Sequence, residues 1–472
     1  MKILLSLFLY TAVTLQAAGL RITGGAVHNQ VFQRGSQNSA DVPVSGEGDN
    51  GQQVEVRLMK KHSVVPGFDW TPLGRVQGGK WNGVISGVPT GGPYGIQVRS
   101  GNSQAALAGL LVGDLWVLAG QSNMQGVGDL INVVPPHDLV HNFDMSDQWV
   151  IAEEPLHTLA NATDPVHWGR NANKQPEKLE GERLRKMVAT RTKGAGLGMA
   201  FAVEMVKRTG VPVGLLSCAH GGTSMDQWDP AKRDQGGDSL YGSMYRRVKA
   251  AGGDVTGVLW YQGESDSSPA AAPLYQGKFE RFIAAVRSDF GKPNLPFYYV
   301  QIGRFINNTN PADWNLVQDV ERKIEQTIPN TGVVAAIDLE LDDLIHVGTD
   351  GLKTLGRRLA LLATNGARRG PRPVKAKLEG GVIRVTFSDV NGRLTGAGPL
   401  TGFTVHDQSG QPVPMIYKIR VDPADGSALL LYHLGKLSPG AMLRYGYGKD
   451  PYCNVRDEAG MALPVFGPMP IE

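Results

Sequence analysis

The pattern of apolar and polar positions changes twice along the chain and divides it into three parts. Between residues 20 and 110, apolar and polar side chains alternate in short runs, for example at 54–58 and 94–98. A period of two is typical of half-buried strands. Turn signals such as Gly91-Gly92-Pro93 separate the runs. We therefore predict a small β-sandwich over residues 20–110.

From about residue 111 to 368, continuous apolar runs replace this alternation. Such runs are typical of strands that are buried on both faces of a parallel sheet. We expect five of these strands, at residues 115–119, 213–217, 258–261, 297–302 and 333–337. Between or after them come apolar helical segments, at residues 197–208, 274–290 and 352–362. The alternation of strand and helix predicts a doubly wound α/β domain over residues 111–368.

Two further segments complete the organisation of the chain. Residues 127–195 are polar, contain several Pro, Asn and His residues, and lack a strong period. A segment of this length is typical of a functional loop or lid. After residue 370 short alternating runs return, at 374–378, 382–387 and 428–432. A second β-sandwich is therefore expected over residues 369–472.

The first 19 residues have the pattern of a secretory signal peptide. Lys2 precedes an apolar run over residues 3–13, and small residues follow at 17–19. The run is shorter than the about 20 apolar residues that a spanning helix needs. We expect cleavage of this segment and a secreted or periplasmic protein without a membrane span.

Composition excludes several other classes of protein. The formal net charge is only +3, and no Lys/Arg stripe with interleaved aromatic residues is present, so no nucleic-acid partner is expected. Two cysteines, Cys218 and Cys453, cannot form a disulfide framework or a cysteine-based zinc site, and we expect them to be unpaired. Four histidines in the 127–195 segment match no compact zinc spacing. No metal and no cofactor are predicted.

Candidate chemistry lies directly after the predicted strands. Open α/β sheets bind ligands beyond the carboxyl ends of their strands. Gly-Gln-Ser-Asn-Met at 120–124 follows the first strand, and Gly-Gly-Thr at 221–223 follows the second. Gln-Gly-Glu at 262–264 follows the third, and Asp343 and His346 follow the fifth. We expect these four segments to meet at one edge of the sheet.

Together the segments supply the parts of an acyl-transfer site. The hydroxyl of Ser122 needs a base to become a nucleophile, and His346 is the candidate. Asp343 can orient that base from the same loop. The backbone N–H groups of Ser122 and of Gly221-Gly222, with the side-chain amide of Gln262, can stabilise an oxyanion. Each part alone has an ordinary structural explanation, such as an N-cap or a turn, but their order on successive strands favours catalysis.

These four segments resemble the blocks of the sialate O-acetylesterase family, which belongs to the SGNH hydrolases and is similar to some acetylxylan esterases. Residues 439–466 also resemble the C-terminal β segment of that family. The resemblance implies a serine esterase that deacetylates a carbohydrate without a cofactor. It implies Ser122 as nucleophile, His346 as base, Asp343 as its partner, and Gly222 and Gln262 as oxyanion donors.

The chain departs from the family pattern in two places near the histidine. Val347 stands where family members often carry Pro, and Asp342 precedes Asp343 as a second candidate carboxylate. Two further carboxylates, Glu264 and Asp338, are expected to be structural hydrogen-bond anchors.

Trp228 and Gln121 are candidate contacts with the sugar, with core packing as the alternative role for Trp228. Two functional alternatives remain open. One is a deacetylase of xylan or pectin, and the other is an inactive carbohydrate-binding protein.

Overall fold

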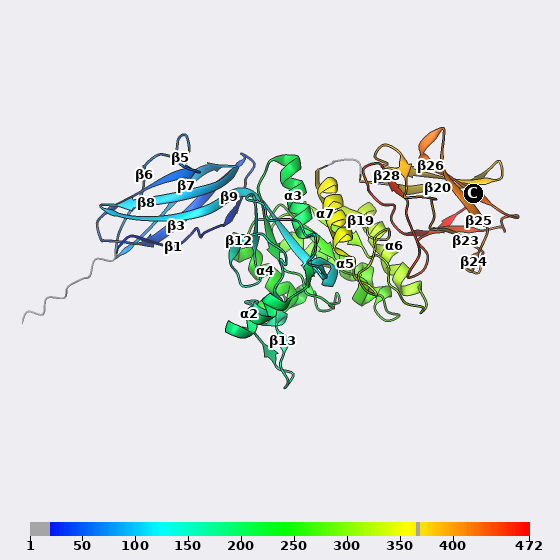
Figure 1. Cartoon of the computed structure of the whole chain (residues 1–472), viewed down its shortest axis with the longest axis horizontal. Coiled ribbons are helices and arrows are strands. Elements are labelled where there is room, and N and C mark those ends of the chain that lie inside the picture. The colour runs from blue at the N-terminus through cyan, green and yellow to red at the C-terminus, as the bar shows by residue number, and fades with distance from the viewer. Residues whose placement is uncertain (1–18, 365–368) are drawn as a thin grey trace, which may run out of the picture.

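The computed structural model describes residues 19–364 and 369–472. The molecule is elongated, with a β-rich part at each end and a central α/β part between them (Figure 1). Apart from Gly19, the predicted signal peptide lies outside the described residues. Within the described part, no helix combines the length and the apolar character needed to cross a bilayer.

The N-terminal part consists of two layers with a shared core, and all strand pairs in them are antiparallel except β2 with β9. One layer contains three strands, β1 (Arg21–Gly24), β3 (Ser39–Glu47) and β7 (Lys80–Pro89). The other contains β2 (Val31–Gln33), β4 (Gln53–Lys60), β5 (Ser63–Val64), β6 (Thr71–Arg75), β8 (Gly91–Ser100) and β9 (Ser103–Gly120). Apolar side chains of both layers form one buried cluster, and the predicted alternation is confirmed along β4 and β8.

Strand β9 joins this part to the centre of the molecule. It is 18 residues long, and its burial changes from alternating to continuous at Leu110. The first half pairs antiparallel with β8, while residues 114–120 pair parallel with central strands. The expected division at residue 110 therefore falls within one continuous strand. A half-buried antiparallel strand thus becomes a fully buried parallel one within β9, and its pairing with β8 shows register shifts near this change.

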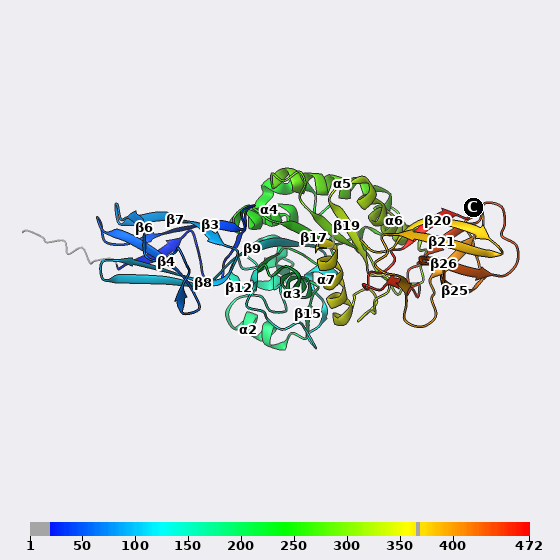
Figure 2. The ribbon, with the colours of Figure 1, turned by 90° about the horizontal axis from the view of Figure 1, so that it is seen from above.

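The central part is a parallel sheet with helices on both faces, as predicted (Figure 2). Its order is β12-β11-β16-β9-β17-β18-β19, in which only the edge strand β12 runs antiparallel. The new strands are β11 (Val140–Phe143), β12 (Trp149–Ile151), β16 (Val213–Ser217), β17 (Gly257–Tyr261), β18 (Phe297–Gln301) and β19 (Thr331–Ala335). All five predicted strands are present, although β19 begins and ends two residues earlier than expected.

Seven helices are described in this part of the chain. They are α1 (Ser122–Gln125), α2 (Gly181–Thr190), α3 (Gly198–Thr209), α4 (Leu240–Ala250), α5 (Ala272–Asp289), α6 (Ala312–Thr327) and α7 (Thr349–Thr364). Helices α3 and α7 cover one face of the sheet, and α4, α5 and α6 cover the other (Figure 2). Short 3₁₀ turns are η1 (Leu159–Asn161), η2 (Pro165–His167), η3 (Pro230–Asp238) and η4 (Glu264–Asp266).

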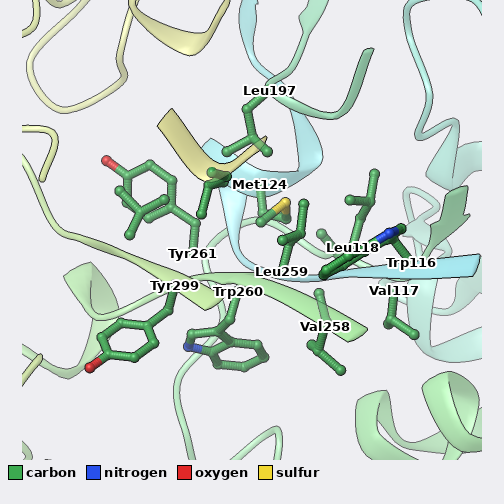
Figure 3. Close-up of a cluster of buried hydrophobic side chains, with 14 of the residues drawn as sticks. Trp116, Val117, Leu118, Met124, Leu197, Val258, Leu259, Trp260, Tyr261 and Tyr299 are labelled. Atoms are coloured by element: carbon green, nitrogen blue, oxygen red, sulfur yellow. The ribbon is translucent and has the colours of Figure 1, made fainter. Parts of the chain in front are cut away.

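Side chains from β9 and β17 alternate between the two faces of the sheet, and both faces are buried. Leu118 and Leu259 point toward Leu197 and Met124 on one side, whereas Trp260 points to the other (Figure 3). Each of these five residues is at most 1% exposed. Because both faces are covered, these strands appear in the sequence as continuous apolar runs.

The 127–195 segment is more ordered than a loop. It contributes β11 and β12 to the central sheet, and also forms the short pairs β10 (Gly128–Asp129) with β15 (Lys193–Ala195) and β13 (Gly169–Arg170) with β14 (Pro176–Glu177). The prediction missed β11 because two polar residues, His141 and Asn142, are buried in it. Their partners are the Asn29 carbonyl for His141, and the Leu156 carbonyl and Ser217 hydroxyl for Asn142.

The C-terminal part contains two four-stranded sheets and a two-stranded pair. The strands are β20 (Arg372–Glu379), β21 (Val382–Ser388), β22 (Leu394–Thr395), β23 (Phe403–His406), β24 (Pro412–Val413), β25 (Ile416–Asp422), β26 (Asp425–His433), β27 (Met442–Tyr445), β28 (Arg456–Asp457) and β29 (Phe466–Pro470). The two larger sheets share one apolar core. Cys453 lies in it, Cys218 lies in the central core, and both are free, as expected.

Candidate active site

Ser122 lies at the first position of α1, directly beyond the carboxyl end of β9. Gly120 makes this turn possible, because its φ is +133° and a Cβ there would lie 2.2 Å from the Tyr261 carbonyl oxygen. The strand can thus end against β17 and turn into α1. Ser122 remains partly accessible, whereas Asn123 and Met124 are buried. The local fold presents one side chain of the Ser-Asn-Met sequence to solvent and anchors the other two.

His346 and Asp343 lie in the loop between β19 and α7, which folds around the carboxylate. Asp343 Oδ1 accepts the N–H groups of Ile345 and His346, both at 2.9 Å. Its Oδ2 lies 2.7 Å from His346 Nδ1, and His346 Nε2 lies 2.9 Å from Ser122 Oγ. Partial burial acts to raise the pKa of Asp343, but the hydrogen bonds from the two N–H groups and from the His346 ring hold it below its usual value. The carboxylate is therefore ionised and orients the imidazole toward the serine.

Asn123 connects the serine turn to the histidine loop. Its Oδ1 accepts the N–H of Val347 at 3.0 Å, and its Nδ2 donates to Glu264 Oε1 at 2.8 Å. Proline at position 347 could not make the first bond because it has no N–H. Burial raises the pKa of Glu264, whose second oxygen, Oε2, is buried without a partner among the described residues. The departure from the family pattern thus has a local structural consequence, and Glu264 is the anchor that the sequence predicted.

Two backbone N–H groups, those of Ser122 and Gly222, are candidate donors to an oxyanion. The N–H groups of Ser122 and Gly222 donate to no acceptor among the described residues. Gly222 is exposed, its φ is +70°, and no atom outside its own neighbours in the chain lies within 4 Å of a Cβ built there. The preceding Gly221 lies against Ser122, with its own N–H bonded to Gln125 Oε1 at 2.8 Å. Free N–H groups beside a nucleophile are suited to a developing negative charge.

The structure does not support the predicted role of Gln262 as an oxyanion donor. Its side chain is fully buried, and its amide nitrogen donates to the Thr223 carbonyl at 3.1 Å and to Asp266 Oδ2 at 2.5 Å. An amide carries two protons, so none remains for a substrate. A rotated amide would place its oxygen against two acceptors. Gln262 therefore connects the 221–223 loop to η4 beneath the site.

The two predicted sugar contacts are also buried. Trp228 has 0% exposure, packs edge-on against Trp260 at 5.2 Å, and donates its indole N–H to Thr223 Oγ1 at 2.9 Å. Gln121 is 3% exposed, and its Oε1 accepts the Ser265 N–H at 3.3 Å. Stacking on a sugar needs an accessible ring face, so core packing is the role that the structure gives Trp228.

The other carboxylates near the site are structural. Asp342, the rival of Asp343, accepts the N–H of Asp129 at 3.3 Å and makes no contact with His346 through its side chain. Asp338 forms two hydrogen bonds with Arg358, which also donates to the Gly460 carbonyl. Asp338 thus anchors the C-terminal part, in agreement with the prediction.

Three of the four histidines of the 127–195 segment, His141, His157 and His167, are buried, and His137 is half-buried. His157 lies close to the backbone of Leu118 and Gln125, on either side of Ser122 in the sequence. In the described ranges, no group of three or more His, Cys, Asp or Glu side chains is arranged to hold a metal ion. No pattern in the sequence indicates that His167 contacts His220, since these residues are 53 positions apart.

With this geometry established, the chain can be compared with known proteins. A family model described as carbohydrate esterase, sialic acid-specific acetylesterase, matches residues 112–365, which is more than half of the 472 residues. A probable carbohydrate esterase of Arabidopsis thaliana is 28% identical over 272 residues, covering 52% of this chain and 88% of that protein. Residues 112–365, which the family model matches, contain Ser122, Gly222, Asp343 and His346.

Two further relatives cover more of the chain. The sialate O-acetylesterase of Homo sapiens is 22% identical over 356 residues, which cover 68% of this chain and 65% of the human protein. The crystal structure of a carbohydrate acetylesterase from Xanthomonas citri aligns with a TM-score of 0.64 and 22% identity, covering 95% of this chain and 99% of that one. The shared fold thus extends over nearly the whole chain, including the β-rich parts at both ends.

Proposed function

The chain belongs to the carbohydrate esterase family of sialic acid-specific acetylesterases, and from this premise we propose that it hydrolyses O-acetyl esters of carbohydrates by a serine mechanism. The observation that carries the proposal is the hydrogen-bonded row of Ser122, His346 and Asp343, with distances of 2.9 and 2.7 Å. A serine whose base is oriented by a carboxylate is the arrangement that nucleophilic acyl transfer requires.

In the proposed mechanism, Ser122 Oγ attacks the acetyl carbonyl carbon while His346 Nε2 takes the hydroxyl proton. The resulting oxyanion is stabilised by the N–H groups of Ser122 and Gly222, without help from the buried Gln262. His346 then gives the proton to the departing sugar hydroxyl. A water molecule, activated by the same histidine, hydrolyses the acetyl-enzyme and releases acetate. Asp343 stays ionised throughout and stabilises the imidazolium.

Several finer assignments belong to the same proposal. The central sheet, with its serine after the first central strand and its Asp-x-x-His after the last, supports an SGNH-type hydrolase domain over residues 111–368. The layered sheets at either end support β-sandwich domains over residues 20–110 and 369–472. A signal peptide over residues 1–19 would direct the enzyme to the periplasm or the exterior.

The substrate is proposed to be an O-acetylated sialic acid, and acetylated xylan or pectin is the second candidate. The family description and the human relative favour the first. The alternative of an inactive carbohydrate-binding protein loses its basis, because family membership and the similarity to a probable carbohydrate esterase indicate an esterase.

Acetate release tests the proposal directly. The purified enzyme should release acetate from at least one of three probes, namely O-acetylated N-acetylneuraminic acid, acetylated xylan and acetylated pectin. Ser122→Ala should abolish more than about 99.9% of the turnover without lowering the melting temperature. The matched control is Ser265→Ala, which alters an exposed serine in the neighbouring loop and should leave turnover near the wild-type value. Wild-type turnover by folded Ser122→Ala would exclude the serine mechanism.

A further inference from the structure

A chain of polar side chains leads from the 220–222 loop into the interior, and the mechanism above does not use it. His220 Nδ1 lies 3.1 Å from Nδ1 of His167 in η2, and His167 Nε2 lies 3.1 Å from Ser243 Oγ in α4. Ser243 Oγ donates to Asp164 Oδ2 at 2.6 Å, and Arg246 donates to the same oxygen at 2.8 Å. Residues of η2, with its N-cap Asp164, and of α4 thus form a hydrogen-bonded row that ends at the side chain of His220.

The inner residues of this hydrogen-bonded row of side chains are almost without exposure to solvent. His167 is 2%, Ser243 0% and Asp164 4% exposed, whereas His220 is half-buried. Polar groups in such surroundings are unfavourable unless each donor meets an acceptor. The hydrogen bonds of the chain therefore have to be made with one consistent arrangement of protons.

That arrangement can be assigned from the buried end outward. Asp164 is a carboxylate paired with Arg246 and can only accept, so the Ser243 hydroxyl donates to it. Ser243 Oγ then accepts from His167 Nε2–H. Burial first, and then the neighbouring His220, lowers the pKa of His167, so its ring is neutral and its Nδ1 carries a lone pair.

The last step of the assignment concerns His220. Its Nδ1 must donate to the lone pair of His167 Nδ1. Burial also lowers the pKa of His220, so its ring is neutral and holds only this one proton. Its Nε2 is therefore a hydrogen-bond acceptor, and this nitrogen has no partner in the described part of the chain.

His220 lies beside the nucleophile. Its N–H donates at 3.0 Å to the carbonyl of Gly120, two residues before Ser122. A Cβ built on Gly221 would lie 3.3 Å from Ser122 Cβ. Consecutive Cα atoms are about 3.8 Å apart, so the Cα of His220 is within about 9 Å of Ser122 Cβ. A sugar ring whose acetyl group is at Ser122 can span this separation.

We propose that His220 is a specificity-determining residue, whose Nε2 accepts a hydrogen bond from a free hydroxyl of the carbohydrate next to the acetyl ester. The inference rests on the function proposed above and adds a feature to it. The tautomer fixed by the buried chain selects donors, so acetyl esters that carry a neighbouring hydroxyl are preferred over esters that lack one. Simple aryl acetates carry no such hydroxyl and are insensitive to His220.

Two substitutions separate this role from mere bracing of the loop. In His220→Asn, the amide nitrogen takes the place of Nδ1 and keeps the bond to His167, but no acceptor remains at the Nε2 position. In His220→Gln, the amide reaches the Nε2 position with its oxygen as acceptor but gives up the bond to His167. His62→Ala, which changes an exposed histidine between β4 and β5, is the matched control.

The experiment measures kcat/KM and melting temperature for these variants with three probes. The probes are 4-nitrophenyl acetate, a mono-O-acetylated methyl glycoside of xylose or N-acetylneuraminic acid, and the same glycoside with the neighbouring hydroxyl replaced by hydrogen. For His220→Asn we expect kcat/KM on the hydroxylated glycoside to fall about 10-fold, as for the loss of one neutral hydrogen bond. The aryl acetate and the deoxy glycoside should be unaffected, and His220→Gln should retain more glycoside activity than His220→Asn.

Other outcomes overturn the inference in distinguishable ways. If His220→Asn matches the wild type while His220→Gln loses activity on all three probes, the histidine only braces the loop. If the wild type hydrolyses hydroxylated and deoxy glycosides equally well, no hydroxyl is recognised, although the serine esterase function stands. If the wild type cleaves only the aryl acetate, the proposed carbohydrate substrate fails, and the hydroxyl contact fails with it.

Discussion

The exposed catalytic row and the polar layer beneath it both come from segments that follow strands of the central sheet, but they have opposite surroundings. In the row, Ser122 and His346 are partly accessible, and the side chain of Asp343 is 46% exposed. In the layer beneath, Gln262 and Trp228 are completely buried. We define the buried layer as Gln262, Asp266, Thr223 and Trp228. A residue's place in a sequence motif therefore does not tell whether it contacts substrate or stabilises a loop.

The difference lies in where the hydrogen-bonding capacity of each group is used. His346 has one ring nitrogen on Asp343 and the other on Ser122, so both are available to the reaction. Gln262 has both amide protons on protein acceptors, and the Trp228 N–H is bonded to Thr223. Groups that are satisfied inside the protein stabilise a geometry, and only unsatisfied or exchangeable groups can act on a substrate.

The largest expected effect is on the exposed row. Asp343→Ala should lower kcat by about 10²- to 10⁴-fold, because the imidazole loses the carboxylate that fixes its tautomer. Asp342→Ala is the matched control in the same loop and should change kcat less than 10-fold, since its carboxylate bonds only to the Asp129 N–H and lies 4.0 Å from the Lys193 amine. Steady-state kinetics on 4-nitrophenyl acetate measure both variants. Equal losses in the two variants would contradict the assignment of the acid.

A substitution in the buried layer should lower the stability of the protein rather than its kcat. Gln262→Ala should lower the free energy of unfolding by about 3 kcal/mol, because Asp266 and the Thr223 carbonyl lose their donor in a buried site. The folded variant should keep kcat within about 10-fold of the wild type, since the backbone donors remain. Denaturant unfolding and kinetics give the two numbers. Gln276→Ala, an exposed glutamine on α5, should change stability by less than about 0.5 kcal/mol.

A stable Gln262→Ala variant with a 10²-fold lower kcat would contradict this assignment. It would return Gln262 to the oxyanion hole and show that its amide turns toward the substrate during the reaction.

A third prediction concerns the pH dependence of stability that Glu154 causes. Burial raises the pKa of Glu154 to about 7, although Gly196 and Leu156 N–H groups bond to its carboxylate. The folded state thus binds this proton more tightly than the unfolded chain does. The stabilisation is present below the unfolded pKa near 4.5 and is lost as pH rises through about 7. This contribution is on the order of 3 kcal/mol.

Glu154→Gln mimics the protonated form at every pH. Its melting temperature relative to the wild type should therefore rise as pH increases from about 5 to 8. Thermal unfolding at several pH values measures this difference. A constant difference between the two proteins would show that the carboxyl has an ordinary pKa.

The smallest expected effect concerns Trp228. Trp228→Phe keeps an aromatic ring in the core but removes the indole N–H bond to Thr223, so stability should fall by about 1 kcal/mol. KM for acetylated glycosides should stay at the wild-type value because the ring does not reach solvent. A selective rise in KM for glycosides, with unchanged stability, would instead indicate that the ring stacks on the sugar.

Much of the central sheet could be predicted because its signals are local. Fully buried parallel strands appear as short continuous apolar runs, and all five expected runs form strands. Strand β11 escaped prediction because its polar residues are satisfied by groups from distant segments, such as the Asn29 carbonyl for His141. A periodicity argument treats such residues as exposed, and only their tertiary partners make burial possible.

In the site, too, the local features could be predicted and the tertiary contacts could not. Asp343 and His346 are three residues apart, and the turn between them is closed by bonds to the Asp343 carboxylate, so their relation could be predicted from spacing. The preference for Asp343 over Asp342 also follows from spacing, and the Asp343 carboxylate is the one that lies 2.7 Å from His346 Nδ1. The role given to Gln262 was wrong because nothing in Gln-Gly-Glu reveals that Thr223 and Asp266 use both of its protons.

The sequence by itself determined the parts of this protein that depend on neighbours along the chain. These include the strand–helix alternation, the serine at the end of a buried strand, the aspartate–histidine turn and the resemblance to an esterase family. Only the tertiary structure decided which polar groups remain free, because hydrogen-bond satisfaction depends on partners from other segments. It buried Gln262 and Trp228 and fixed the tautomer of His220 through His167, Ser243 and Asp164. It also left the Ser122 and Gly222 N–H groups without an acceptor among the residues that the structure describes.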